Sequence, residues 1–196
     1  MNHPDFTELR RCIDEAITFN DLIRARTLSL EGLQIAEEKE RAGEVCFFRA
    51  QLSIIEGKFE EAVPYLRQAL VHNPLDGAAY NDLALCAVES GKIDGVLEIF
   101  DQGIAVEPDY ATIHHNKGWF LNKLGLHHEA LACFQKALEL EPRRAVTFEN
   151  MADVFEHLGE IAKALAAYKM ALALIKAPFS QIRVQVEGEI RRLESA

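Results

Sequence analysis

This sequence contains no long apolar run and no Cys-x-x-Cys pair, and we expect no secretory leader. No stretch of about 18 consecutive apolar residues occurs, so we expect no membrane-spanning helix. Charged residues appear from Asp5 onwards and include Glu8 and Arg10, without the apolar region that a signal peptide needs. The 4 cysteines form no Cys-x-x-Cys pair, which argues against a zinc site or a disulfide framework and favours a reducing compartment. We therefore predict a cytoplasmic protein.

Basic residues are in the minority. The chain has 21 lysines and arginines against 31 aspartates and glutamates, a formal net charge of -10. A phosphate backbone selects clustered lysine and arginine side chains, so an acidic chain of this kind is a poor partner for it. We expect neither nucleic acid nor a membrane among its partners.

Sequence patterns of catalysis and of metal binding are also lacking. There is no glycine-rich phosphate loop, no Gly-x-Ser-x-Gly elbow and no His-Glu-x-x-His. The histidine pairs His114-His115 and His127-His128 are adjacent in sequence. Adjacent side chains on a helix point about 100° apart, whereas two metal ligands on one helix usually stand at i and i+4. We therefore predict no enzymatic activity, no cofactor and no metal site.

A regular spacing of small and bulky residues is what the sequence does contain. Glycines recur every 34 positions, and a glycine can take the left-handed conformation that ends a helix. Small residues that allow two helices to approach alternate with bulky residues that fill the space between them. The four columns in phase are Gly57, Gly91, Gly125 and Gly159; Ala50, Ala84, Gly118 and Ala152; Ala62, Val96, Ala130 and Ala164; and Leu66, Phe100, Phe134 and Tyr168.

This 34-residue pattern resembles the tetratricopeptide repeat (TPR) family. The resemblance implies an all-α fold, a right-handed superhelical solenoid of helix-turn-helix repeats. The predicted repeats are 43–76, 77–110, 111–144 and 145–178. Residues 1–42 are predicted to form a degenerate N-terminal helical hairpin joined near Asn20-Asp21, and residues 179–196 a C-terminal capping helix.

The second repeat has two glycines, Gly95 and Gly103, in the segment predicted as its second helix. Each glycine in a helix costs on the order of 1 kcal/mol relative to alanine. We therefore predict that this repeat is the least stable internal one.

The TPR resemblance also implies a concave groove lined by the first helix of each repeat. Asp82, Asn116 and Asn150 recur at one repeat position, where an amide can bond both polar groups of an extended peptide backbone. The alternative is a row of solvated polar residues on an exposed face. Trp119 has two interpretations as well, a binding anchor or a residue of the inter-repeat core. The predicted peptide-binding residues are Phe47, Gln51, Asn81, Asp82, His115, Asn116, Trp119, Lys123, Glu149, Asn150 and Asp153.

The predicted groove is acidic at its C-terminal end, where Glu149, Asp153 and Glu156 occur. This charge favours a partner segment, an extended peptide or a helix, with basic residues and an apolar anchor. A subtype of the family grips acidic C-terminal peptides with basic groove residues. The sequence does not fit that subtype, because Phe47 and Thr112 stand where basic side chains are expected.

The functional prediction is a protein-protein interaction scaffold or adaptor that binds a partner segment in its TPR groove. Two alternatives remain open. One is an acidic TPR chaperone for a secreted client protein. The other is a self-assembling TPR scaffold, a homo-oligomer in which an end helix of one molecule fills the groove of another.

Overall fold

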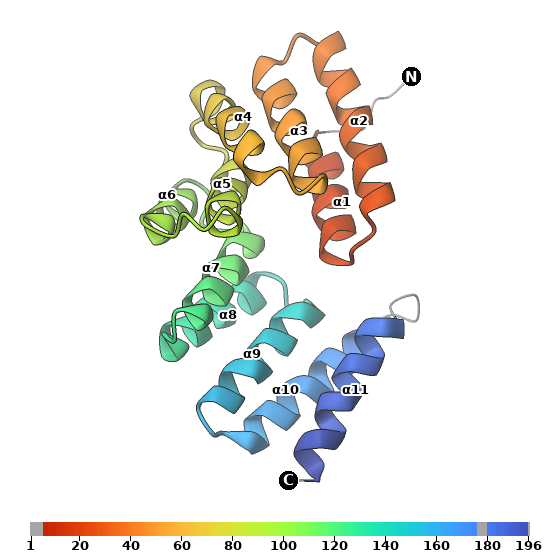
Figure 1. The fold of residues 1–196 in the computed structure, drawn as a ribbon, viewed down its shortest axis with the longest axis vertical. Coiled ribbons are helices and arrows are strands. Elements are labelled where there is room, and N and C mark those ends of the chain that lie inside the picture. Colours follow the sequence, from red (N-terminus) through yellow and green to blue (C-terminus); the bar gives the residue numbers. More distant parts are fainter. Residues whose placement is uncertain (1–5, 176–179, 196) are drawn as a thin grey trace. The chain divides into compact units, whose positions relative to one another are not determined.

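The chain folds into α-helices throughout the part that the computed structural model describes, residues 6–175 and 180–195. These residues form eleven helices and no strand (Figure 1). The predicted all-α class is therefore confirmed. The helices are α1 (Phe6–Thr18), α2 (Leu22–Glu38), α3 (Ala42–Ile55), α4 (Phe59–His72), α5 (Gly77–Glu89), α6 (Val96–Val106), α7 (Ala111–Lys123), α8 (His127–Leu140), α9 (Ala145–His157), α10 (Ile161–Leu174) and α11 (Ser180–Glu194).

The helices belong to two compact units, Met1–Pro108 and Asp109–Ala196. The first unit contains α1 to α6 and the second α7 to α11. Within each unit every helix packs against the next one along the chain, so the helices form sequential pairs. The predicted boundary between residues 178 and 179 lies outside the described residues.

The repeated glycines end the first helix of each pair. Gly57 has a φ of +71°, and its N–H bonds the carbonyl oxygen of Ile54 at 2.9 Å. The next residue, Lys58, bonds the carbonyl oxygen of Ser53 at 2.8 Å, which closes the turn. A glycine has no Cβ atom to strain this conformation. Positive φ angles recur at Gly91, Gly125 and Gly159.

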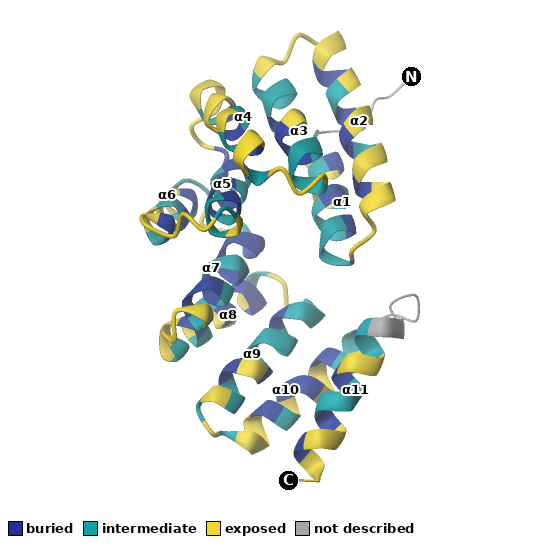
Figure 2. Cartoon of the chain, viewed as in Figure 1, coloured by how far each residue is buried: buried dark blue, intermediate teal, exposed yellow. Residues whose placement is uncertain are grey.

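The predicted small and bulky columns form the core. Ala62 on α4 and Leu66 one turn later are both fully buried. The corresponding residues of later helices, Phe100 and Phe134, are also fully buried. Figure 2 shows buried residues on the inward side of each helix and exposed residues at the turns. Apolar burial of this kind is the main stabilising contribution to the stack.

The first hairpin, α1 with α2, keeps the same buried positions with different residues. Ala25, Ser29 and Gly32 each stand 37 positions before Ala62, Leu66 and Ala69 (62 − 25 = 37), and all three are buried. Ser29 occupies the position of the bulky column and bonds the carbonyl oxygen of Ala25 at 2.8 Å. The ring of Phe48 on α3 lies against Gly32, where a Cβ atom would come too close to its Cε1 atom.

Gly95 was predicted inside the second helix of its repeat, but it lies just outside that helix. It stands immediately before α6 with a φ of +77°, in the left-handed conformation. The helix therefore begins at Val96 and has 11 residues, with Gly103 buried in its interior. None of the helices within the described residues is long and apolar enough to cross a membrane.

Candidate peptide-binding site

Phe47, the first predicted site residue of the N-terminal unit, already has a cationic neighbour. It lies on α3, is only 3% exposed, and the guanidinium carbon of Arg10 is 3.6 Å from its ring centroid. Arg10 comes from α1 and also donates to both carboxylate oxygens of Asp76, at 2.9 and 2.8 Å. A third contact is an ion pair with Glu44 at 2.9 Å. The face of the Phe47 ring is therefore covered by the protein's own arginine.

Gln51, Asn81 and Asp82 are brought together in one hydrogen-bonded group. The amides of Gln51 and Asn81 both donate to the Asp82 carboxylate, the second at 3.1 Å. Burial raises the pKa of Asp82 to about 7, against the lowering effect of these hydrogen bonds. The Gln51 and Asn81 side chains are buried, and Asp82 is half-buried. These three predicted residues thus bond one another inside the unit.

His115, in the C-terminal unit, is buried between α7 and α9. Its Nδ1 atom is 2.9 Å from the Thr147 hydroxyl oxygen, and its Nε2 atom is 3.3 Å from the amide nitrogen of Asn150. Burial lowers the pKa of His115 to about 3, and the charge of Arg144 contributes in the same direction. The ring is therefore neutral at pH 7, with one nitrogen as donor and the other as acceptor.

Asn116, Trp119 and Lys123 follow one another along α7. Asn116 and Trp119 are half-buried, and Lys123 is exposed. The Lys123 ammonium is 4.2 Å from the Trp119 ring centroid, a cation–π contact. Trp119 is thus neither a fully buried core residue nor a fully exposed one.

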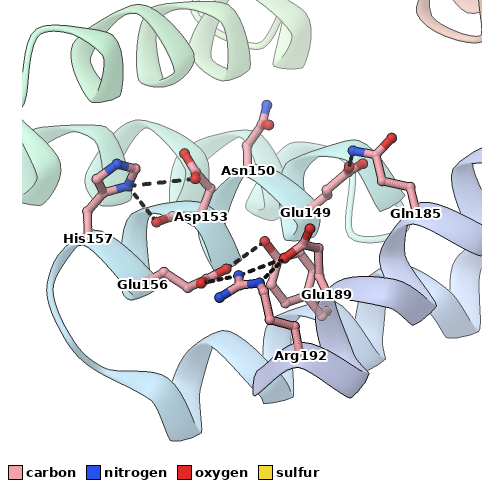
Figure 3. Close-up of a pocket in the computed structure, with 9 residues that line it drawn as sticks. Glu149, Asn150, Asp153, Glu156, His157, Gln185, Glu189 and Arg192 are labelled. Atoms are coloured by element: carbon pink, nitrogen blue, oxygen red, sulfur yellow. Dashed lines mark hydrogen bonds and ion pairs between the residues drawn. The ribbon is translucent and has the colours of Figure 1, made fainter. Parts of the chain in front are cut away.

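A pocket of about 510 Å³ lies between α9 and α11. Of the predicted site residues, Glu149, Asn150 and Asp153 line it (Figure 3). Sequence reasoning missed the part that α11 contributes, namely Gln185, Glu189 and Arg192. Their spacing of i, i+4 and i+7 on one helical face is a signal that was present in the sequence. The acidic pocket is lined by Glu149, Asn150, Asp153, Glu156, His157, Tyr168, Gln185, Glu189 and Arg192.

Arg192 neutralises part of the acidic pocket. It bonds Glu156 and forms an ion pair with Glu189 at 2.6 Å, as Figure 3 shows. The Tyr168 hydroxyl donates a further hydrogen bond to Glu156 at 2.9 Å. Glu156 and Glu189 therefore already have partners within the protein.

Glu149 and Asp153 have polar but not permanently charged partners in the described residues. Glu149 accepts a long hydrogen bond, 3.4 Å, from the Gln185 amide, and burial raises the pKa of its carboxyl. Asp153 accepts a 2.6 Å bond from the Asn122 amide and lies 3.7 Å from Nδ1 of His157. Because burial disfavours the charged carboxylate, an incoming cation would stabilise Glu149 in particular.

Two histidines stack beside the pocket. The rings of His127 and His157 are 5.0 Å apart with an interplanar angle of 20°. Nδ1 of His127 contacts Asn122 at 2.7 Å, and Nδ1 of His157 contacts the carbonyl oxygen of Asp153 at 2.8 Å. Among the described residues, no three histidine, cysteine or carboxylate side chains gather as a metal site would require.

Comparison with known proteins gives the family. Profiles of the tetratricopeptide repeat match residues 53–116 and 109–177. A TPR protein from Thermus thermophilus superposes with a TM-score of 0.74 and 19% identity, covering 97% of this chain and 99% of that one. YrrB, described as a TPR protein with an unusual peptide-binding site, gives a TM-score of 0.61 at 18% identity, covering 95% and 94%. The chain is a tetratricopeptide repeat protein. TPR domains generally mediate protein–protein binding, and proteins of this family are typically non-catalytic scaffolds.

The curated relatives are longer and more distant. Hsp70-Hsp90 organizing protein 3 of Arabidopsis thaliana is 28% identical over 109 residues, which is 56% of this chain and 18% of that protein. An Hsp70-Hsp90 organising protein of Plasmodium falciparum is 27% identical over 107 residues, 55% of this chain and 40% of that one. The aligned part thus spans less than half the length of either relative.

Proposed function

We propose that this TPR protein is an adaptor that binds a basic segment of a partner protein, with one basic side chain of that segment in the acidic pocket. The observation that supports this most is the charge of the pocket. Glu149, Asp153, Glu156 and Glu189 line it, and Arg192 is the only lysine or arginine among the described lining residues. A complementary cation would both bind there and be steered towards it.

The N-terminal unit provides an internal precedent for such binding. Arg10 lies over the Phe47 ring with carboxylates of Asp76 and Glu44 around its guanidinium group. A planar guanidinium is suited to this combination of ring face and paired carboxylate. In the acidic pocket, Glu149 and Asp153 offer carboxylates that an arginine from a partner can meet in the same way.

The apolar anchor of the partner is expected to contact Trp119. Asn122, on the same helix, donates to Asp153 at the rim of the pocket. Trp119 is three residues earlier and therefore one helical turn away. A large, rigid indole is a typical hot spot of binding surfaces. A segment with a basic residue near an apolar one matches this arrangement, and we expect Asn116 and Asn150 to bond its backbone.

Binding of acidic C-terminal tails is the competing hypothesis. The curated relatives are named for organising Hsp70 and Hsp90. Here Thr112, at a position expected to be basic in tail-binding members, is buried and accepts a 3.1 Å bond from Arg144. An acidic tail would also meet the unneutralised carboxylates of the acidic pocket, which disfavours it.

Two capped nonapeptides test the proposal: a basic peptide of alternating leucine, alanine and arginine, and an acidic peptide with glutamate in place of arginine. Fluorescence of the single tryptophan can report the titration. We expect the basic peptide to bind and to weaken as salt is added, since exposed charges are screened. Binding of the acidic peptide with equal or higher affinity would contradict the proposal and favour the tail-binding hypothesis.

Charge-neutral variants locate the site. The double variant Glu149→Gln, Asp153→Asn is expected to lose about tenfold in affinity for the basic peptide, the effect of removing charge-assisted contacts worth about 1.4 kcal/mol. Glu129→Gln is the matched control, because Glu129 is exposed on α8 and does not line the pocket. Equal binding by the double variant and the control would show that the basic peptide binds outside the acidic pocket.

A further inference from the structure

We propose that His115 is a positioning residue that holds the Asn150 amide with its carbonyl oxygen towards the acidic pocket, so that the pocket selects N–H donors. The inference rests on the proposed function, because it specifies which chemistry the pocket accepts. It differs from the predicted role of His115 as a residue that touches the partner directly.

The imidazole ring of His115 is held by contacts on three sides. His115 is 5% exposed, and its ring lies 5.6 Å from that of Phe134. Both ring nitrogens contact α9, Nδ1 at the buried Thr147 hydroxyl and Nε2 at the Asn150 amide nitrogen. A ring held at three points has little freedom to reorient, so it can act as a fixed reference for whatever it bonds.

The direction of each His115 hydrogen bond follows from the group that its ring nitrogen meets. An amide nitrogen can only donate, so Nε2 of His115 accepts from Asn150. A neutral imidazole has one acceptor and one donor, and Nδ1 therefore donates to the Thr147 hydroxyl oxygen. Burial keeps the pKa of His115 near 3, so that the acceptor remains unprotonated at pH 7.

The orientation of the Asn150 amide determines which of its atoms faces the acidic pocket. The oxygen and nitrogen of an amide diverge from one carbon, so fixing the nitrogen towards His115 turns the oxygen away from it. Figure 3 shows the Asn150 nitrogen directed away from Glu149 and Asp153. The side chain lines the pocket together with these two carboxylates. All three then present acceptors, which favours a guanidinium, an ammonium or a backbone N–H and disfavours a carboxylate ligand.

The tautomer of His115 is the most direct test, and it needs no ligand. Nitrogen NMR of histidine-labelled protein at pH 7 is expected to show His115 neutral, with the proton on Nδ1. A proton on Nε2 would overturn the inference, because Asn150 would then present its nitrogen to the pocket.

Binding of the basic nonapeptide is the second test. His115→Phe keeps a ring against Phe134 but removes the acceptor, and we expect affinity to fall about threefold to tenfold, as for one lost hydrogen bond. His115→Gln restores an acceptor and should recover part of this loss. His128→Phe, at an exposed histidine of α8, is the control and should bind as the wild type does. A His115→Phe variant that binds the peptide with wild-type affinity would overturn the inference.

Thr147→Val is a second variant that keeps the test decisive if His115→Phe does not fold. It removes the partner of Nδ1 while nearly preserving side-chain volume, so the tautomer is no longer fixed. We expect mixed tautomers and a change in the Asn150 side-chain amide resonance. An unchanged resonance would count against the positioning role of His115. If the wild type binds neither peptide, the proposed function fails, and the tautomer and this resonance still decide the positioning role.

Discussion

The ring of Phe134 lies against the backbone of Gly118, so that a Cβ atom at residue 118 would be 2.9 Å from both Cδ1 and Cε1 of the ring. The carbonyl oxygen of Ala130 would be only 3.1 Å away on the same side. Other repeats have alanine at this position, as at Ala84 and Ala152. The ring of Phe134 therefore occupies the space that an alanine methyl group at residue 118 would need.

Gly118→Ala is expected to destabilise the protein by about 1–3 kcal/mol, the usual cost of overpacking a well-packed core. The better helix propensity of alanine offsets part of this, on the order of 1 kcal/mol. Urea denaturation followed by circular dichroism measures the change. Gly188→Ala is the control, because nothing lies within 4 Å of the added Cβ atom in α11, and it should be neutral or stabilising.

Arg10→Ala is expected to destabilise the protein by about 2 kcal/mol, less than for a fully buried ion pair because Arg10 is partly exposed. The substitution leaves the Asp76 side chain, 4% exposed, without its cation and removes the group that covers Phe47. Thermal unfolding can measure the loss. Arg11→Ala, which breaks an exposed pair with Glu8, should change stability by less than about 0.5 kcal/mol; an equal effect of both variants would argue against the Arg10 contacts.

Asp82→Asn should stabilise the protein at pH 8 but have little effect near pH 4. The folded pKa of Asp82 is raised to about 7 from 3.8, so the native state binds more protons than the unfolded state between these values. Stability from this group is therefore fully present below pH 4 and lost as pH rises through 7. Because Asp82 is only half-buried, we expect a gain of about 1–2 kcal/mol at pH 8. Denaturation of both proteins at the two pH values tests this, and a pH-independent difference would contradict it.

Arg192→Gln is expected to strengthen binding of the basic nonapeptide about threefold and to steepen its salt dependence. The substitution releases Glu156 and Glu189, both of which lie in the acidic pocket. More unneutralised carboxylates attract a cation more strongly at low ionic strength. Arg191→Gln removes the same charge from an exposed position outside the pocket and is the control. Weaker binding by the Arg192 variant would mean that the arginine itself contacts the partner.

Backbone amides of α6 are expected to exchange faster with solvent than those of α8. Helix α6 has 11 residues and contains Gly103, whereas α8 has 14 residues and an alanine at the corresponding position. A shorter helix with a glycine has a lower local unfolding free energy. Hydrogen exchange read by mass spectrometry measures both helices in one sample. Equal protection would show that packing, and not local propensity, decides their stability.

Several features of the site could be predicted from the repeat pattern and others could not. The position of Glu149, Asn150 and Asp153 on one helical face follows from their spacing, and all three line the acidic pocket. Gln51, Asn81 and Asp82 of the first unit stand at the same repeat positions as these residues, yet Gln51 and Asn81 bond Asp82 and are buried. Spacing indicates which way a side chain faces but not what already lies against it.

The helices and their pairing follow from the amino-acid sequence alone. The 34-residue period predicts three kinds of position directly, because each is a local requirement. These are glycines with positive φ, alanines that allow helices to approach closely, and aromatic residues that fill the gaps between them. Tertiary structure alone decided which polar groups remain available for a partner. Arg10 reaches Asp76 across 66 positions of sequence, and Arg192 reaches Glu156 across 36. Such contacts depend on how helices far apart in the chain come together, and no local pattern specifies them.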